Sequence, residues 1–155
     1  MDNLMPVEIK KLNADDIGSF QELLFVFEKV FEMEDFSIPN KEHLQRLLGK
    51  EGFHVFVAFL EGKVVGGLTA HTLPQYYSTM PLVYIYDLAV STELQRKGIG
   101  RMLISGVKAY CREMGMEEVF VQADEEDAHA LDFYQATGGR AEKVVHFTYS
   151  INKKE

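Results

Sequence analysis

The sequence has few of the features that would place the protein outside the cytoplasm. It contains one cysteine, Cys111, so no disulfide can form within the chain, and this usage fits a reducing compartment. No apolar run reaches the length of a membrane span. The N-terminal residues, MDNLMPVEIKKL, have neither the basic nor the apolar segment of a signal peptide. We therefore expect a cytoplasmic protein without a membrane partner, in which Cys111 packs on the apolar face of a helix.

Cations are also scarce relative to anions. The chain has 16 lysines and arginines against 24 aspartates and glutamates, a formal net charge of -8. This balance argues against nucleic acid as a partner, because phosphates would be repelled. It favours a cationic partner, although excess carboxylates also serve solubility alone. Four carboxylates are concentrated in one run, Asp124-Glu125-Glu126-Asp127.

The chain shows no repeat, low-complexity tract or interdomain linker, and its 155 residues predict a single domain over 1–155. Alternating or continuous apolar runs predict strands at residues 7–12, 54–60, 64–73, 82–90, 119–123 and 143–151. Helical spacing of apolar residues predicts helices at 17–31, 41–48, 99–114 and 128–137. This order predicts an α/β (α+β) fold in which helices flank a mixed central β-sheet, with the last strand buried.

The segment from Leu82 to Met114 is the centre of this plan. Its strand is apolar on both expected faces, which predicts a central position in the sheet. One face would carry Leu82, Tyr84, Tyr86, Leu88 and Val90, and the other Val83, Ile85, Asp87 and Ala89. Asp87 is the only charged residue among them. The helix that follows should bury Ile99, Leu103, Val107, Tyr110 and Met114.

Between this strand and this helix lies Gln95-Arg96-Lys97-Gly98-Ile99-Gly100-Arg101. The first turn of a helix has backbone N–H groups without partners and the positive end of the helix dipole, so it can bind phosphate oxygens. Glycine lets the backbone approach such a ligand closely. The alternative is a tight turn with a solvated basic edge. The spacing fits neither a dinucleotide-binding fingerprint nor a Walker loop.

The residues around this turn carry a resemblance. Leu88-Ala89-Val90 followed by Gln95-x-x-Gly98-x-Gly100 resembles the coenzyme A signature of the GNAT superfamily of N-acetyltransferases, and Asp127-x-x-Ala130-x-x-Phe133-Tyr134-x-x-x-Gly138 resembles its second signature. Asp127 replaces the usual Asn, and Gly139 replaces the usual Phe. The resemblance covers nearly the whole chain and implies the GNAT fold, with acetyl-CoA as acetyl donor and no metal.

The resemblance also implies a coenzyme site and two catalytic roles. The backbone N–H of Leu88 would stabilise the oxygen that becomes negatively charged in the transition state, and Tyr134 would protonate the departing thiolate. Without the surrounding pattern, a helical tyrosine would more often be packing. The implied coenzyme contacts are Leu88, Ala89, Val90, Gln95, Arg96, Lys97, Gly98, Ile99, Gly100, Arg101, Asp127, Ala130 and Tyr134.

Asp87 is the candidate for the amine side of the reaction. A carboxylate on an apolar strand is costly to bury unless it is paired. It therefore either meets a lysine or arginine of the protein or binds the substrate ammonium and takes its proton, directly or through water. His146, on the predicted last strand, is the alternative base because an ordinary histidine pKa of about 6.5 suits the task.

A narrower resemblance concerns the acceptor. Tyr84-Ile85-Tyr86-Asp87-Leu88-Ala89-Val90, Val121-Gln122-Ala123-Asp124 and Val145-His146-Phe147 resemble the type I aminoglycoside 3-N-acetyltransferases, the gentamicin-modifying branch of the superfamily. This implies acetylation of the 3-amino group of a cationic antibiotic, and thereby antibiotic resistance. Substrate contacts would then come from Asp87, Asp124, Glu125, Glu126 and His146.

Three alternatives remain at this point. The acceptor is another polyamine, or it is a peptide amine, or the chain is an acetyl-CoA-binding module without turnover. The tyrosine-rich loop at residues 74–81 and the apolar last strand are candidates either for a homodimer edge or for burial within one chain.

Overall fold

The computed structural model describes residues 6–152. Its residues form two compact units, the first ending at Gln122 and the second beginning at Ala123. Each unit is described by itself.

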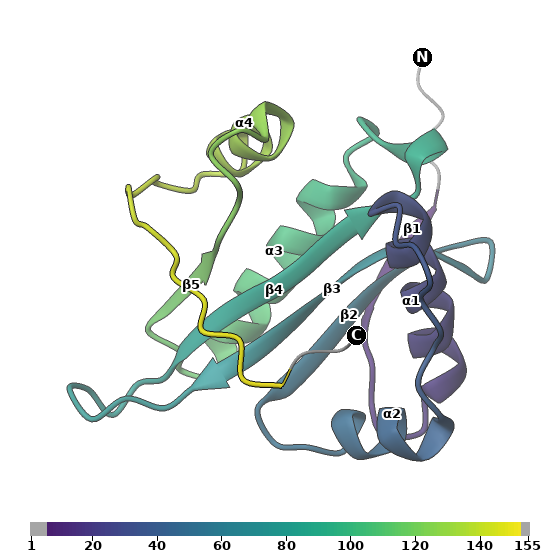
Figure 1. Cartoon of the computed structure of the whole chain (residues 1–155), viewed down its shortest axis with the longest axis horizontal. Helices are drawn as coiled ribbons and strands as arrows, with labels where there is room; N and C mark the ends of the chain where they lie inside the picture. Colours follow the sequence, from purple (N-terminus) through teal and green to yellow (C-terminus); the bar gives the residue numbers. More distant parts are fainter. Residues whose placement is uncertain (1–5, 153–155) are drawn as a thin grey trace. The chain divides into compact units, whose positions relative to one another are not determined.

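The first unit is built on a five-stranded sheet in the order β1-β2-β3-β4-β5 (Figure 1). Neighbouring strands are antiparallel from β1 to β4, whereas β4 and β5 are parallel. The strands are β1 Val7–Lys11, β2 Phe53–Leu60, β3 Lys63–Leu73, β4 Leu82–Val90 and β5 Glu118–Val121. The helices are α1 Ile17–Val30, α2 Lys41–Leu48 and α3 Ile99–Glu113, with a short 3₁₀ turn η1 at Thr92–Leu94. The predicted mixed sheet flanked by helices is confirmed.

Glycines fix the geometry of the hairpin between β2 and β3. Glu61 and Gly62 both have positive φ, 51° and 78°, as a tight two-residue hairpin turn requires. Further along β3, a Cβ at Gly67 would lie 2.6 Å from a methyl carbon of Leu23 in α1. Glycine at this position therefore lets α1 lie directly on the sheet.

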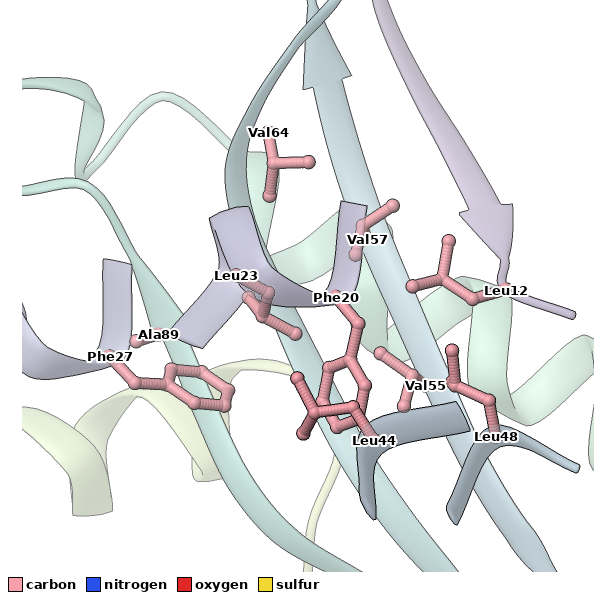
Figure 2. Close-up of a cluster of buried hydrophobic side chains, with 10 residues drawn as sticks. All are labelled: Leu12, Phe20, Leu23, Phe27, Leu44, Leu48, Val55, Val57, Val64 and Ala89. Carbon is pink, nitrogen blue, oxygen red and sulfur yellow. The ribbon is translucent and has the colours of Figure 1, made fainter. Parts of the chain in front are cut away.

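Helices α1 and α2 cover one face of the sheet. Figure 2 shows their buried side chains meeting those of the strands. The cluster contains Leu12, Phe20, Leu23, Phe27, Leu44, Leu48, Val55, Val57, Val64 and Ala89. On α1, Phe20 and Phe27 are buried, while Phe31, just beyond the helix, is exposed.

Helix α3 packs against the opposite face, where the ring of Tyr110 contacts those of His54 and Phe56. Its buried residues are Ile99, Leu103, Ile104, Val107 and Cys111. Cys111 is thus a packing residue, as expected. The expected burial of Met114 is wrong, because the helix ends at Glu113 and Met114 is 54% exposed.

The second unit contains one helix, α4, at Ala128–Ala136. Asp127 caps its first turn, since its Oδ1 accepts a hydrogen bond from the N–H of Ala130 at 3.0 Å. At the other end, Gly138 has a φ of 98°, and the N–H of Gly139 donates to the carbonyl of Tyr134 at 2.8 Å. This is the Schellman arrangement, for which glycine is favoured because of the left-handed backbone.

The expected last strand is not formed. Residues 143–151 have no strand assignment, and the large apolar side chains there are 69% to 86% exposed. They are Val144, Val145, Phe147, Tyr149 and Ile151. The apolar alternation predicted strand and burial, but a strand needs a neighbour for its backbone hydrogen bonds. None of the second unit's described residues forms a strand that could be that neighbour.

Candidate functional site

The centre of the candidate site is a β-bulge in β4. Ile85 lies opposite Ala70 of β3 and Asp87 lies opposite Thr69, so that Tyr86 is the extra residue. A bulge shifts the alternation of side chains along its strand. Cross-strand partners share a face, which places Asp87 on the face of Thr69 rather than on that of Ile85. The alternation predicted for this strand is therefore wrong from Asp87 onward, whereas Tyr86 lies on the face of Tyr84 as predicted.

The bulge leaves the Asp87 carboxylate half-buried on the sheet face that carries α1 further along β4, where Ala89 joins the cluster of α1. Within residues 6–152 this carboxylate has no hydrogen bond and no ion pair. Burial raises the pKa of Asp87 above its ordinary value, because desolvation disfavours the charged form. The alternative of a structural pair with lysine or arginine finds no support in the part of the chain that the structure describes.

One edge of β4 is open next to Asp87. β5 pairs with β4 only from Leu82 to Ile85, and no other described strand of this unit pairs with that edge further on. The N–H of Ser91 points toward β3, where it donates to the carbonyl of Val65 at 2.8 Å. Because backbone groups alternate in direction along a strand, the N–H groups of Leu88 and Val90 point to the open edge.

The glycine turn that follows is tied back to this edge. The Gln95 side chain donates from Nε2 to the carbonyl of Val90 at 3.0 Å. Gly98 is the N-cap of α3 with a φ of 87° and provides no side-chain cap. A Cβ there would have no neighbour within 4 Å, so glycine is needed for its backbone conformation rather than for space within the protein.

The residues of this turn have the character that an anion site needs. The side chains of Arg96, Lys97 and Arg101 are exposed, and they surround the start of α3, where N–H groups of the first turn have no intrahelical acceptor. The turn from Gln95 to Arg101 follows the end of β4 after the short 3₁₀ turn η1, and the hydrogen bond from Gln95 to Val90 links it to the strand. Ile99 is buried and contributes to the core by its side chain.

The remaining predicted site residues belong to the second unit. Asp124, Glu125, Glu126 and His146 are exposed. Asp127 is the helix cap described above, a structural role that accounts for it without a ligand. Ala130 and Tyr134 lie on α4 and are half-buried, and the Tyr134 ring meets that of Phe133 edge to face, with centroids 5.1 Å apart.

The structure adds aromatic residues that sequence reasoning did not single out. Phe53, His71, Tyr84 and Phe120 are cross-strand partners on β2, β3, β4 and β5. The ring of the bulge residue Tyr86 contacts those of His71 and Tyr84. These side chains form an aromatic row across the sheet. The row depends on the pairing of strands that are distant in the sequence, so no local sequence pattern predicts it.

Two further observations bear on the kind of site. Among residues 6–152, no three or more histidine, cysteine, aspartate or glutamate side chains are grouped so that they could hold a metal ion. The helices of these residues are all too short or too polar to cross a membrane.

Comparison with known proteins agrees with this arrangement. The model of the Acetyltransferase (GNAT) family matches residues 19–138. The aminoglycoside acetyltransferase meta-AAC0020 from an uncultured soil metagenomic sample, solved in complex with sisomicin, is 53% identical, with a TM-score of 0.93 over 94% of this chain and 97% of that chain. A second soil metagenomic aminoglycoside acetyltransferase, HMB0005, is 33% identical, with a TM-score of 0.90 over 96% of this chain and 100% of that chain.

A curated relative is more distant. The aminoglycoside N(6')-acetyltransferase type 1 of Stenotrophomonas maltophilia is 27% identical over 113 residues, which are 70% of this chain and 74% of that protein. The mixed sheet, with one half-open strand β4 followed by a glycine turn into α3, thus has the fold of known acetyltransferases. The chain belongs to the acetyltransferase (GNAT) family.

Proposed function

We propose that this N-acetyltransferase moves an acetyl group from acetyl-CoA to the 3-amino group of an aminoglycoside antibiotic. The unpaired, half-buried carboxylate of Asp87 beside the open edge of β4 carries the proposal. Such a group is suited to hold a substrate ammonium. The 53% identity to a protein solved with the aminoglycoside sisomicin supports an aminoglycoside as the source of that ammonium.

The donor half of the site fits the coenzyme. The N–H groups of Leu88 and Val90 face the open edge and match the amide and thioester carbonyls of an extended pantetheine arm. The start of α3, with the cations of Arg96 and Lys97 around it, matches a pyrophosphate. Acetyl-CoA would supply the activated acetyl group as a thioester.

The chain's own groups then have three tasks. Asp87 binds the ammonium and removes its proton, directly or through one water, so that the amine becomes a nucleophile. The N–H of Leu88 donates a hydrogen bond to the carbonyl oxygen as it gains negative charge. Tyr134 is assigned the protonation of the leaving sulfur. Asp124, Glu125 and Glu126 are assigned to the other ammonium groups of the acceptor through charge-assisted hydrogen bonds.

The first experiment measures thiol release from acetyl-CoA with gentamicin, sisomicin, spermidine and peptides with a free N-terminus. We expect rapid release with the two aminoglycosides. Transfer only to peptide amines would refute the aminoglycoside proposal, and coenzyme binding without release for any amine would favour a non-catalytic module. NMR of the acetylated sisomicin then tests the position, where an acetyl group at the 6'-amine would contradict the 3-amino assignment.

Two variants test which group is the base. Asp87→Asn keeps the size of the side chain but cannot accept a proton, and we expect turnover to fall by roughly 10²-fold or more. His146→Ala should retain most of the turnover. If the two results were interchanged, the general base would be His146.

A further inference from the structure

The β4 bulge brings two successive side chains to one face of the sheet. Asp87 faces Thr69, and Thr69 is two residues from His71 on β3, so these residues share a face. The centroid of the Tyr86 ring lies 6.1 Å from that of His71, and the two ring planes meet at 81°. The centroid of the Tyr84 ring lies 6.0 Å from that of Tyr86, with an interplanar angle of 78°. An aromatic ring and an unpaired carboxylate therefore project next to each other.

The rings beneath Tyr86 are fixed in place. Tyr84 stacks on Phe120, with centroids 4.9 Å apart and planes at 15°, and its hydroxyl donates to Oε1 of Gln122 at 3.0 Å. On the other side, His71 packs against Phe53 with centroids 5.2 Å apart. Tyr86 thus rests on a row of rings held by packing and by a hydrogen bond.

Tyr86 itself is open. It is 61% exposed, so most of its ring surface is available to a ligand. A tyrosine face attracts cations through its quadrupole, and the effect grows when water is excluded. Next to it, Asp87 attracts the same kind of ligand by its charge. The two residues are complementary to a saturated ring that offers its C–H groups to the tyrosine face and bears an ammonium group.

We infer that Tyr86 is a specificity-determining residue for the acceptor: its ring, supported by His71 and Tyr84, receives the aminocyclitol or amino-sugar ring whose ammonium is held by Asp87. This inference rests on the proposed function and adds a contact to it. The bulge is then a functional feature of β4. It turns Asp87 toward the acceptor and adds an aromatic surface beside it.

The test compares substitutions of Tyr86 in the full chain, with sisomicin as acceptor. Tyr86→Ala should raise the KM for sisomicin about tenfold, which is the range of a partly desolvated cation–π contact. The KM for acetyl-CoA should change less than twofold. Tyr86→Phe keeps the ring and should recover most of the lost affinity, whereas Tyr86→Leu, apolar but not aromatic, should recover little. Tyr76→Ala is the matched control, because Tyr76 is an exposed tyrosine in the loop before β4.

A second acceptor separates ring recognition from charge. Spermidine has ammonium groups but no ring, so Tyr86→Ala should affect its KM less than that of sisomicin. An unchanged KM for sisomicin in Tyr86→Ala, with normal turnover of the parent protein, would overturn this inference and leave the proposed function intact. If the parent protein neither bound nor acetylated sisomicin, the proposed function and this inference would both be overturned.

Discussion

We predict that the buried histidine of β2 makes the stability of the protein depend on pH. His54 is 7% exposed, its Nε2 lies 2.7 Å from Oγ1 of Thr72, and its Nδ1 has no partner among the described residues. Burial, with smaller contributions from the charges of Lys11 and His71, lowers the pKa of His54 from 6.5 to about 4. Protonation would make both ring nitrogens donors, and Nδ1 would then lack an acceptor.

The sign and size of the effect follow from proton linkage. Below pH 6.5 the unfolded chain binds a proton at this histidine, while the folded chain does so only near pH 4. The contribution of His54 to the free energy of unfolding is therefore fully present above pH 6.5 and is lost as the pH decreases toward 4. The difference between 6.5 and about 4, at about 1.36 kcal/mol for each pH unit, is a loss of about 3 kcal/mol.

Urea unfolding at a series of pH values between 7 and 4 measures this loss. His54→Gln keeps a hydrogen-bonding group for Thr72 but does not titrate, so its stability should fall about 3 kcal/mol less than that of the parent over this range. The variant must be compared with the parent protein because the raised pKa of Asp87 increases stability as the pH falls, which is opposite to the effect of His54. His43→Gln is the control, since His43 is exposed on α2.

The same pH slope in His54→Gln and in the parent protein would refute this reasoning. NMR titration of the parent gives an independent reading that does not require the variant to fold. A His54 pKa near 6.5 would show that burial does not keep the ring neutral.

Three further predictions address the site and the packing. The raised pKa of Asp87 should appear as an acidic limb in kcat/KM, which rises with pH through a pKa above 3.8; a limb that persists in the residual activity of Asp87→Asn would assign it to another group. Gly67→Ala should destabilise the protein by roughly 1–3 kcal/mol in urea unfolding, because the new Cβ would lie 2.6 Å from Leu23 Cδ1 and from the carbonyl oxygen of Phe56. The control Gly18→Ala should instead stabilise the protein by roughly 0.5–1 kcal/mol, because Gly18 is helical and a Cβ there would have no neighbour within 4 Å. Equal effects of the two substitutions would contradict the packing argument. Tyr134→Phe should lower kcat with little change in coenzyme affinity, and an unchanged kcat would remove Tyr134 from the mechanism.

Local patterns were sufficient for most of the fold. The predicted strands at 54–60 and 64–73 and the buried face of α3 each depend on residues a few positions apart, whose conformational preferences act within a turn or two. The prediction for residues 143–151 failed because strand formation also requires a partner, and apolar alternation contains no information about one. The prediction that Met114 is buried was wrong for a smaller reason. The helical period continues through it, but the helix stops at Glu113.

Some residues of the candidate site could likewise be predicted from local sequence, and others could not. The glycine turn and the charged Asp87 on an apolar strand could be recognised from consecutive residues. The match to the acetyltransferase (GNAT) family model agrees with the resemblance that these residues carry. The aromatic row could not, because His71 and Tyr84 become neighbours only through the register of β3 and β4.

The bulge at Tyr86 shows why the register matters for chemistry as well as for packing. A regular β4 would place Asp87 on the face of Ile85, which is 2% exposed and lies on the side of the sheet that α3 covers. A carboxylate there would cost several kcal/mol without a partner. One extra residue moves Asp87 to the other face while the N–H of the next residue, Leu88, still points to the open edge of β4. The proposed base and the proposed oxyanion donor are thus adjacent in sequence, and in this proposal the bulge lets Asp87 bind the acceptor while Leu88 faces the donor.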